Sequence, residues 1–182
     1  MLQGPRTEDE MNETPQRYTQ RILGYVKGRQ SLAVQAATAG RLARLMKGVS
    51  MTRLRKRPAL DKWSVSEIVA HLADGEIVGG FRMRFILGSP GSPIVAYDQD
   101  KWVTSGHYDK RDPRKSLELF RVVREANLAL LKSLKPEQWR VYGRHSERGR
   151  ESIEDIVRMF AGHDLNHLQQ IEKILGRSSR RN

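Results

Sequence analysis

Apolar residues recur every three or four positions along five segments of the chain, whereas the alternation typical of β-strands is nearly absent. The segments cover residues 16–26, 31–47, 64–87, 114–134 and 152–175. This spacing lines apolar side chains along one face of an α-helix, and that face has to be buried against another element. The four longer segments therefore predict an all-α fold, a four-helix bundle, preceded by one short helix.

Residues with strong capping preferences mark the borders of these segments. Ser64 and Glu67 have the spacing of a capping box, in which each side chain accepts a hydrogen bond from the other residue's backbone N–H. Ser152 can cap the last helix, which carries acidic residues in its first turn. Gly48 and Gly176 are placed to stop two of the helices at their C-terminal ends.

The connection between the second and third helices of the bundle, residues 88–113, is long. It is rich in Gly, Pro and Asp and contains Tyr97, Trp102 and Tyr108. A structureless loop of this length is uncommon in a domain unless it is functional or disordered. Its aromatic residues favour a functional crossover. Residues 143–150, rich in Gly and Arg, predict a second and shorter loop.

The length of 182 residues suits one domain with short extensions. Residues 1–15, with four acidic residues and two prolines, are predicted to form a flexible N-terminal arm, residues 16–176 the helical domain, and residues 177–182 a basic tail. No run of uncharged apolar residues is long enough to predict a membrane span. The N-terminus lacks the apolar stretch of a secretory signal, so we expect a cytoplasmic protein.

The charge is strongly basic and unevenly distributed. The chain has 33 Lys and Arg against 21 Asp and Glu, a net charge of +12. Residues 14–60 contain eleven basic residues and no acid, and a basic connector spans residues 51–58. Such a balance is typical of proteins that bind nucleic acid or another polyanion, but also of ordinary proteins with a basic outer face. Because no aromatic stacking platform accompanies the basic run, nucleic acid is a possible partner that is not favoured.

Three of the five histidines lie on apolar helix faces. His163 and His167 are four residues apart on the apolar stripe of the last helix, so their rings project from one face one turn apart. His71 lies in the middle of the apolar stripe of the second bundle helix. His107 and His145 lie in predicted loops and are expected on the surface.

A single histidine on an apolar stripe is more often a hydrogen-bonded core residue than a metal ligand. Three on two helices that a bundle can place side by side favour a divalent metal. Because the chain has no cysteine, nitrogen and oxygen must hold any such ion. Three imidazoles would leave a position open for water or substrate, and Asp74 and Asp164 are placed to orient the rings.

Three further residues are candidates for the wall of a substrate pocket. Arg82 shares the helix face of His71 and could meet an anionic group of a small-molecule substrate, or pair with an acid such as Asp164. Trp102 and Tyr108, in the long connection, could either cover the pocket or plug the end of the bundle. No catalytic group besides the metal is predicted.

Two sequence motifs and a shorter segment resemble a known family. Residues 63–74 (WSVSEIVAHLAD) and residues 162–171 (GHDLNHLQQI) resemble the second-helix and last-helix signatures of the DinB-like (DinB/YfiT) superfamily of metalloenzymes. Residues 97–102 (YDQDKW) resemble the loop between them. The resemblance implies a four-helix bundle, frequently dimeric, with a divalent metal held by His71, His163 and His167.

Similar proteins include metal-dependent hydrolases and thiol S-transferases, so the resemblance implies an enzyme that activates water or a low-molecular-weight thiol on its divalent metal. Three imidazoles accept zinc, nickel, copper or iron, and of these we expect zinc or nickel. Because the chain has no cysteine, the thiol would be a cosubstrate. Two alternatives stay open. The protein could be a non-catalytic, metal-stabilised module whose basic face contacts nucleic acid or another polyanion. It could also bind the metal for stability alone.

Overall fold

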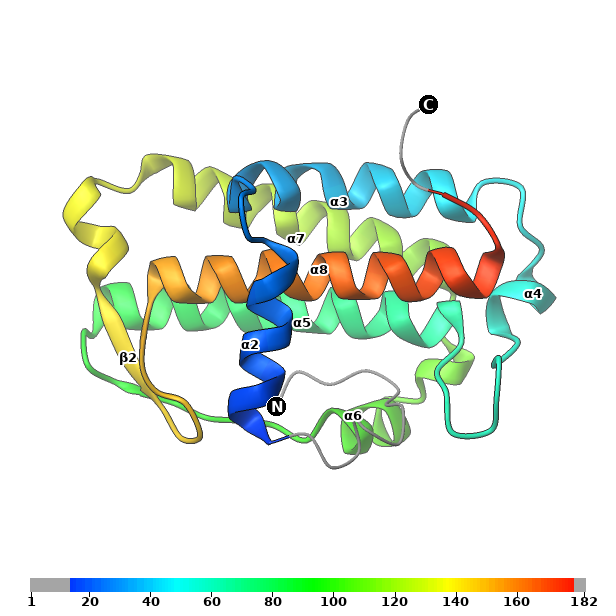
Figure 1. Cartoon of the computed structure of the whole chain (residues 1–182), viewed down its shortest axis with the longest axis horizontal. Helices are drawn as coiled ribbons and strands as arrows, with labels where there is room; N and C mark the ends of the chain where they lie inside the picture. The colour runs from blue at the N-terminus through cyan, green and yellow to red at the C-terminus, as the bar shows by residue number, and fades with distance from the viewer. Residues whose placement is uncertain (1–13, 179–182) are drawn as a thin grey trace.

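The computed structural model describes residues 14–178, and four long helices make up most of it. They lie side by side along the long axis of the molecule: α3 (Ser31–Met46), α5 (Val65–Gly88), α7 (Pro113–Ser133) and α8 (Ile153–Leu175) (Figure 1). α5 and α3 each pack on both α7 and α8, so the four helices enclose one core. The predicted four-helix bundle is confirmed, and each bundle helix begins and ends within one residue of its prediction.

The direction of the helices explains the long connection. α5 and α7 are neighbours that run in the same direction, whereas α3 and α8 run the opposite way (Figure 1). The chain therefore has to return along the whole bundle between α5 and α7. The sequence predicts no regular structure there, and the structure corrects this. The connection contains β1 (Pro93–Ile94), α6 (Gln99–Ser105) and η1 (Tyr108–Lys110), and the Asp98 side chain caps α6.

Two further short α-helices flank the bundle. α2 (Pro15–Tyr25) crosses α8 at a steep angle and buries Tyr18 and Ile22 (Figure 1). A Cβ atom at Gly162 of α8 would collide with the backbone of Ile22, so the close approach of α2 requires glycine there. α4 (Met51–Arg55) lies within the predicted basic connector. The predicted N-terminal arm lies outside the described residues, apart from Thr14, the N-cap of α2, and Pro15, its first residue.

The second departure from the sequence prediction is a small sheet. β2 (Tyr142–His145) and β3 (Gly149–Ser152) form an antiparallel hairpin where a loop was predicted, and β1 pairs in parallel with β2. A Cβ atom at Gly143 would lie 2.7 Å from Ile86, so the sheet packs closely on the last turns of α5. This contact stabilises strands of only two to four residues, which local sequence preference does not reveal.

The predicted helix ends are confirmed. Capping boxes start α5 at Ser64 and Glu67 and α8 at Ser152, and Gly176 ends α8 with φ of 60°. Among residues 14–178, no helix combines the length and the apolar character needed to cross a membrane.

Candidate metal centre

Three histidine side chains from two neighbouring helices converge inside the bundle. The Nε2 atom of His163 lies 3.0 Å from Nε2 of His71 and 2.9 Å from Nε2 of His167. Each side chain is at most 2% exposed. His71 lies on α5, and the other two lie one turn apart on α8. Helix packing thus brings together the residues that sequence analysis singled out as metal ligands.

Burial keeps these imidazoles neutral. It lowers the pKa of His71 and of His163 well below the usual 6.5, and that of His167 to about 4. The neighbouring imidazoles add to the effect at His71 and His163, because two protonated rings side by side would repel each other. The neutral ring is the form whose free lone pair can bind a metal.

Contacts around the cluster orient the rings. The Nδ1 atom of His167 lies 2.8 Å from Oε1 of Gln170. An amide oxygen only accepts hydrogen bonds, so Nδ1 carries the proton and Nε2 of His167 presents its lone pair to the cluster. The ring of Trp63 lies 5.1 Å from that of His71, centre to centre. Sequence reasoning missed Gln170, although its spacing of three residues from His167 is that of neighbours on one helix face.

The donor set fits a divalent metal ion. Neighbouring nitrogens in a tetrahedral zinc site are about 3.3 Å apart, given Zn–N bonds of about 2.0–2.1 Å. The two distances from His163 are slightly shorter than this. A single Nε2 atom of His163 can make a good hydrogen bond with only one of its two neighbours. One cation can bind all three nitrogens and retain a free coordination position.

The prediction that Asp74 and Asp164 orient the imidazoles is corrected by the structure, because their hydrogen bonds go elsewhere. Asp164 accepts from Arg124 Nη1 at 2.6 Å and from the Thr38 hydroxyl at 2.9 Å. Asp74 accepts from the Tyr108 hydroxyl at 2.6 Å and forms an ion pair with an arginine of the crossover. Each aspartate therefore joins its own helix to another element.

Asp164 belongs to a buried ionic network behind His163. Arg124 of α7 forms an ion pair with Asp164 and a second one with Glu76 of α5, at 2.7 Å. Asn127 Nδ2 donates to the Glu76 carboxylate at 2.8 Å. Burial alone would lower the pKa of Arg124, but the two carboxylates raise it above the usual value, so the guanidinium is charged. The network joins α5, α7 and α8 beside the histidines.

Comparison with known sequences identifies the family of this bundle. The sequence profile of the DinB superfamily matches residues 36–171, which include all three histidines. The chain belongs to the DinB superfamily.

Relatives of this DinB chain include two named "putative metal-dependent hydrolase". The protein from Halalkalibacterium halodurans is 25% identical over 138 residues, which are 76% of this chain and 80% of the relative. The one from Oceanobacillus iheyensis is 28% identical over 116 residues, 63% of this chain and 66% of the relative. The fold also matches the solved structure of YfiT from Bacillus subtilis, with a TM-score of 0.73 and 18% identity. The match covers 97% of this chain and 99% of YfiT, which is described as "a probable metal-dependent hydrolase with an unusual four-helix bundle topology". That match establishes the fold.

Tyr108, one of the residues predicted to line a substrate pocket in this DinB chain, is buried in the core and also borders a small pocket. It is 1% exposed, belongs to the core and donates to Asp74. The pocket has a volume of about 210 Å³, and Trp102, Asp74 and Arg111 line it together with Tyr108.

Arg82 and Trp102 are connected through Tyr97. The guanidinium carbon of Arg82 lies 5.7 Å from the centre of the Tyr97 ring, and that ring lies 4.3 Å from Trp102. Arg82 is buried, and its Nη2 donates to the Val95 carbonyl at 2.6 Å. The predicted alternative, an ion pair between Arg82 and Asp164, is therefore wrong.

The remaining two histidines differ in position. His107 is exposed as predicted. His145 is only 3% exposed, so the prediction that it lies on the surface is wrong. It is the register partner of Ile94 in the small sheet, and residues paired in this way point to the same face. Because the hairpin was not predicted, the inward orientation of His145 was missed.

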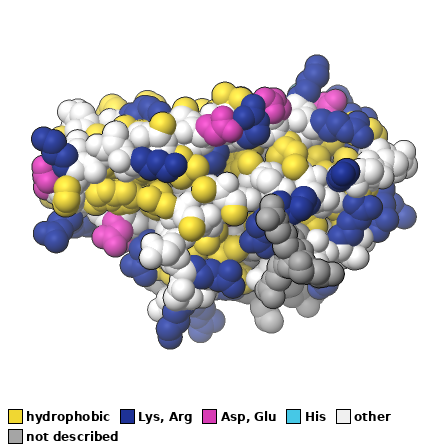
Figure 2. Space-filling model, turned by 90° about the horizontal axis from the view of Figure 1, so that it is seen from above, with side chains coloured by type: hydrophobic (Ala, Val, Ile, Leu, Met, Phe, Trp, Pro, Cys, Tyr) yellow, Lys and Arg dark blue, Asp and Glu magenta, His cyan; other side chains and the backbone are white. Residues whose placement is uncertain are grey.

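Some of the basic residues bond to other parts of the chain, and others are exposed on the surface. Lys and Arg side chains are spread over the face seen in Figure 2 and gather toward the end of the bundle where α4 lies. Three arginines hold chain segments together there: Arg53 donates to the Leu175 carbonyl, Arg57 to the Glu67 carboxylate and Arg177 to the Lys47 carbonyl. Part of the basic excess therefore stabilises the ends of the bundle helices, while Arg55 and Lys56 are exposed.

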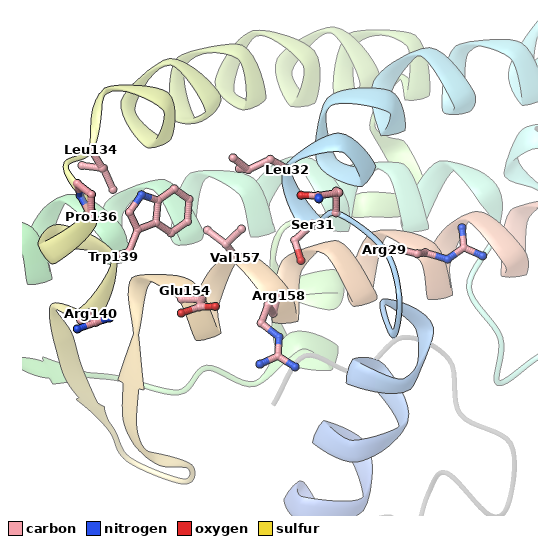
Figure 3. Close-up of a pocket in the computed structure, with 11 residues that line it drawn as sticks. Arg29, Ser31, Leu32, Leu134, Pro136, Trp139, Arg140, Glu154, Val157 and Arg158 are labelled. Atoms are coloured by element: carbon pink, nitrogen blue, oxygen red, sulfur yellow. The ribbon is translucent and has the colours of Figure 1, made fainter.

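A larger surface pocket lies at the opposite end of the bundle. It has a volume of about 690 Å³ and is lined by residues of α3, α8 and η2 (Pro136–Arg140). Leu32 and Trp139 form part of its wall, and Arg140 and Arg158 lie at its rim (Figure 3). None of the three clustered histidines lines this pocket, so it is separate from the candidate metal centre.

Proposed function

We propose that this DinB protein is a metal-dependent enzyme, with a hydrolase activity, that holds one divalent ion through His71, His163 and His167. The observation that carries the proposal is the convergence of three buried imidazoles, with Nε2 of His71 and of His167 both within 3.0 Å of Nε2 of His163. The names of the relatives from Halalkalibacterium and Oceanobacillus support hydrolysis. Zinc and nickel are the ions we favour, because both accept imidazole ligands.

A divalent ion bound by three imidazoles can lower the pKa of a bound water or polarise a carbonyl group of a substrate. The residues of the chain then have separate tasks. The three histidines bind, Gln170 holds the ring of His167, and Trp63 packs against His71. Burial of the centre excludes bulk water, which strengthens each electrostatic interaction with a substrate.

The first experiment measures metal content per chain by elemental analysis of untagged protein. We expect about one divalent ion in the native chain and none in the His163→Ala/His167→Ala double variant. The control is His107→Ala, which removes an exposed histidine and should leave the metal content unchanged. Absence of metal from the native chain after reconstitution with zinc and with nickel would contradict the proposal.

The second experiment separates hydrolysis from thiol transfer. The metal-loaded protein is tested on a panel of esters, amides and lactones in water, and separately on electrophiles with a low-molecular-weight thiol. We expect hydrolysis that is lost in the double variant. Metal-dependent turnover found only with a thiol would assign the protein to the S-transferases, with the thiol as cosubstrate. Bound metal without turnover in either assay would favour a purely stabilising role.

The basic end of the bundle supports a second candidate function, binding of nucleic acid or another polyanion. Arg55 and Lys56 are the residues to test, because both are exposed and Arg53 and Arg57 have internal partners. Charge reversal at both should weaken binding of a fluorescent DNA duplex and reduce its salt dependence. The double histidine variant should bind DNA normally. Equal binding by the charge-reversed variant would reject this function.

A further inference from the structure

A second group of polar side chains lies outside the histidine cluster, formed by Arg82, Tyr97 and His145. We call it the Arg82 site. Arg82 lies on α5, Tyr97 follows β1 and His145 lies on β2. The guanidinium carbon of Arg82 lies 5.7 Å from the centre of the Tyr97 ring. Arg82 also donates to Val95, and the adjacent Ile94 is the register partner of His145, so β1 brings the three side chains together.

Each of these side chains offers hydrogen-bond donors that the described chain does not use. The Tyr97 hydroxyl and Nε2 of His145 are buried and have no hydrogen-bond partner among residues 14–178. The backbone N–H of Glu147 donates to Nδ1 of His145 at 3.1 Å, so the neutral ring carries its proton on Nε2. Arg82 has five N–H donors. The Val95 carbonyl is its one hydrogen-bond acceptor within residues 14–178.

Charged side chains of both signs lie near the Arg82 site, namely Arg148 and the carboxylates of Glu147 and Glu151. Glu147 is exposed, and the buried carboxylate of Glu151 is paired with Arg148 at 2.8 Å. Burial, together with the charges of Arg148 and Arg82, lowers the pKa of His145 to about 3, so this ring is neutral. The Tyr97 hydroxyl and Nε2 of His145 therefore have no acceptor within residues 14–178, and Arg82 uses one of its donors, toward Val95. Buried donors without an acceptor are costly unless a ligand or a water molecule supplies the acceptor oxygen.

The Arg82 site and the histidine cluster lie along the same face of α5. His71, Gly75 and Arg82 lie at successive positions i, i+4 and i+11 of α5, which fall on one helix face. Eleven residues of helix span about 16 Å. A Cβ atom at Gly75 would meet no atom within 4 Å, so unfilled space lies beside α5 between the two groups.

We propose that Arg82, Tyr97 and His145 bind an oxyanion, a carboxylate or phosphate group, of a small-molecule ligand whose other end reaches the histidine cluster past Gly75. Binding of the oxyanion follows from the donors of the Arg82 site alone. The second part, the reach to the histidines, rests on the proposed function.

The first test uses acetate and phosphate as probes. Protein labelled with ¹⁵N-histidine is titrated with each anion against chloride at constant ionic strength, and the Nε2 resonance of His145 is followed by NMR. We expect a saturable shift in the millimolar range. Tighter binding of acetate would indicate a carboxylate ligand, and tighter binding of phosphate a phosphorylated one. Absence of a saturable shift with both anions would overturn the proposal.

Variants assign the binding to the named residues. Arg82→Met should weaken the anion affinity about tenfold or more, because it removes a charged donor. Tyr97→Phe, which deletes one hydroxyl and keeps the packing, should weaken it about 2- to 10-fold. Arg158→Met removes an exposed arginine of α8 and serves as the control. An affinity unchanged in Tyr97→Phe and in a folded Arg82→Met would refute the assignment.

A second test examines the path toward the histidines. Straight-chain carboxylates from acetate to octanoate should bind more tightly with each added methylene, by up to about fourfold, as the chain fills the space beside Gly75. Gly75→Leu should abolish this gain and leave acetate binding intact. The same length dependence in Gly75→Leu would show that the two sites are not connected.

The same titrations on the His163→Ala/His167→Ala double variant keep the two proposals apart. Acetate and phosphate should bind this variant as they bind the native chain, because the Arg82 site contains none of the clustered histidines. Failure of metal binding would thus leave the anion result standing, and failure of anion binding would leave the metal centre standing.

Discussion

His163 and Asp164 are neighbours in α8, yet they belong to two buried polar clusters of opposite character. In the ionic network, Arg124 faces two carboxylates, so unlike charges neutralise each other within the chain. In the histidine cluster, three neutral imidazoles face one another, and Nε2 of His163 cannot make a good hydrogen bond with both of its neighbours. Both clusters are almost inaccessible to solvent. Burial is therefore common to both clusters, and they differ in whether the polar atoms are paired within the chain.

The largest expected effect lies in the ionic network. Arg124→Met leaves Asp164 and Glu76 buried without a cation and should lower the free energy of unfolding by about 3–5 kcal/mol, measured by urea denaturation. The control is Arg121→Met, which breaks only exposed ion pairs of α7 and should cause no measurable change. Equal stability of the two variants would show that the network is dispensable.

The complementary change in the histidine cluster should affect metal binding rather than folding. Four-ligand zinc sites bind with about 10–16 kcal/mol, so His163→Ala should weaken metal binding on the order of 100- to 1,000-fold. Competition with a chelator measures this affinity. The unfolding free energy of the metal-free protein should change less than in Arg124→Met. A variant that kept its metal affinity would remove His163 from the ligand set.

A further comparison asks whether Gln170 or Asp74 orients the imidazoles of the histidine cluster. Gln170→Leu removes the hydrogen bond to His167 and should weaken metal binding about 10- to 100-fold. Asp74→Asn should leave metal affinity unchanged, because the hydrogen bonds of Asp74 go to the crossover. The same chelator competition tests both variants. A larger loss in Asp74→Asn would restore the role that the sequence suggested for this aspartate.

The smallest expected effects are changes in stability when a methyl group is added to a glycine of α5, either where a neighbour already fills the space or where the space is unfilled. A Cβ atom at Gly79 would lie 2.6 Å from the ring of Phe160, so Gly79→Ala should destabilise the protein by about 1–3 kcal/mol. Gly75→Ala meets no neighbour and should stabilise by up to about 1 kcal/mol, because alanine favours helix. Thermal unfolding of the two variants measures the difference. Destabilisation by Gly75→Ala would show that the space beside it is occupied.

The helices could be predicted from sequence because their signals are local. Apolar spacing and capping residues such as Ser64 and Ser152 act within a few positions, and the structure retains each of them. The hairpin was missed because its strands are short and depend on packing against α5, as the close contact of Gly143 with Ile86 illustrates. The helix α6 within the crossover was missed although Asp98 caps it, because seven residues are too few to show a clear apolar spacing.

In the candidate site, too, features with a local sequence signal could be predicted, whereas features that depend on packing could not. The three histidines could be selected because each lies on an apolar helix face, where a polar side chain stands out. The ion-pair partner of Asp164 could not be predicted from the sequence, because it depends on which residue of α7 is turned toward α8. Arg124 has apolar neighbours at helical spacing, such as Phe120 and Leu128, and nothing in its own segment reveals two carboxylates opposite it.

The parallel course of α5 and α7 also bears on the order in which the molecule forms. His71 and His163 are 92 residues apart, and the long crossover has to close before α7 can take its place beside α5. A growing or truncated chain that lacks α8 holds only His71 of the three. An ion bound as proposed would therefore find its full set of ligands only in a finished molecule, and it would stabilise completed chains rather than folding intermediates.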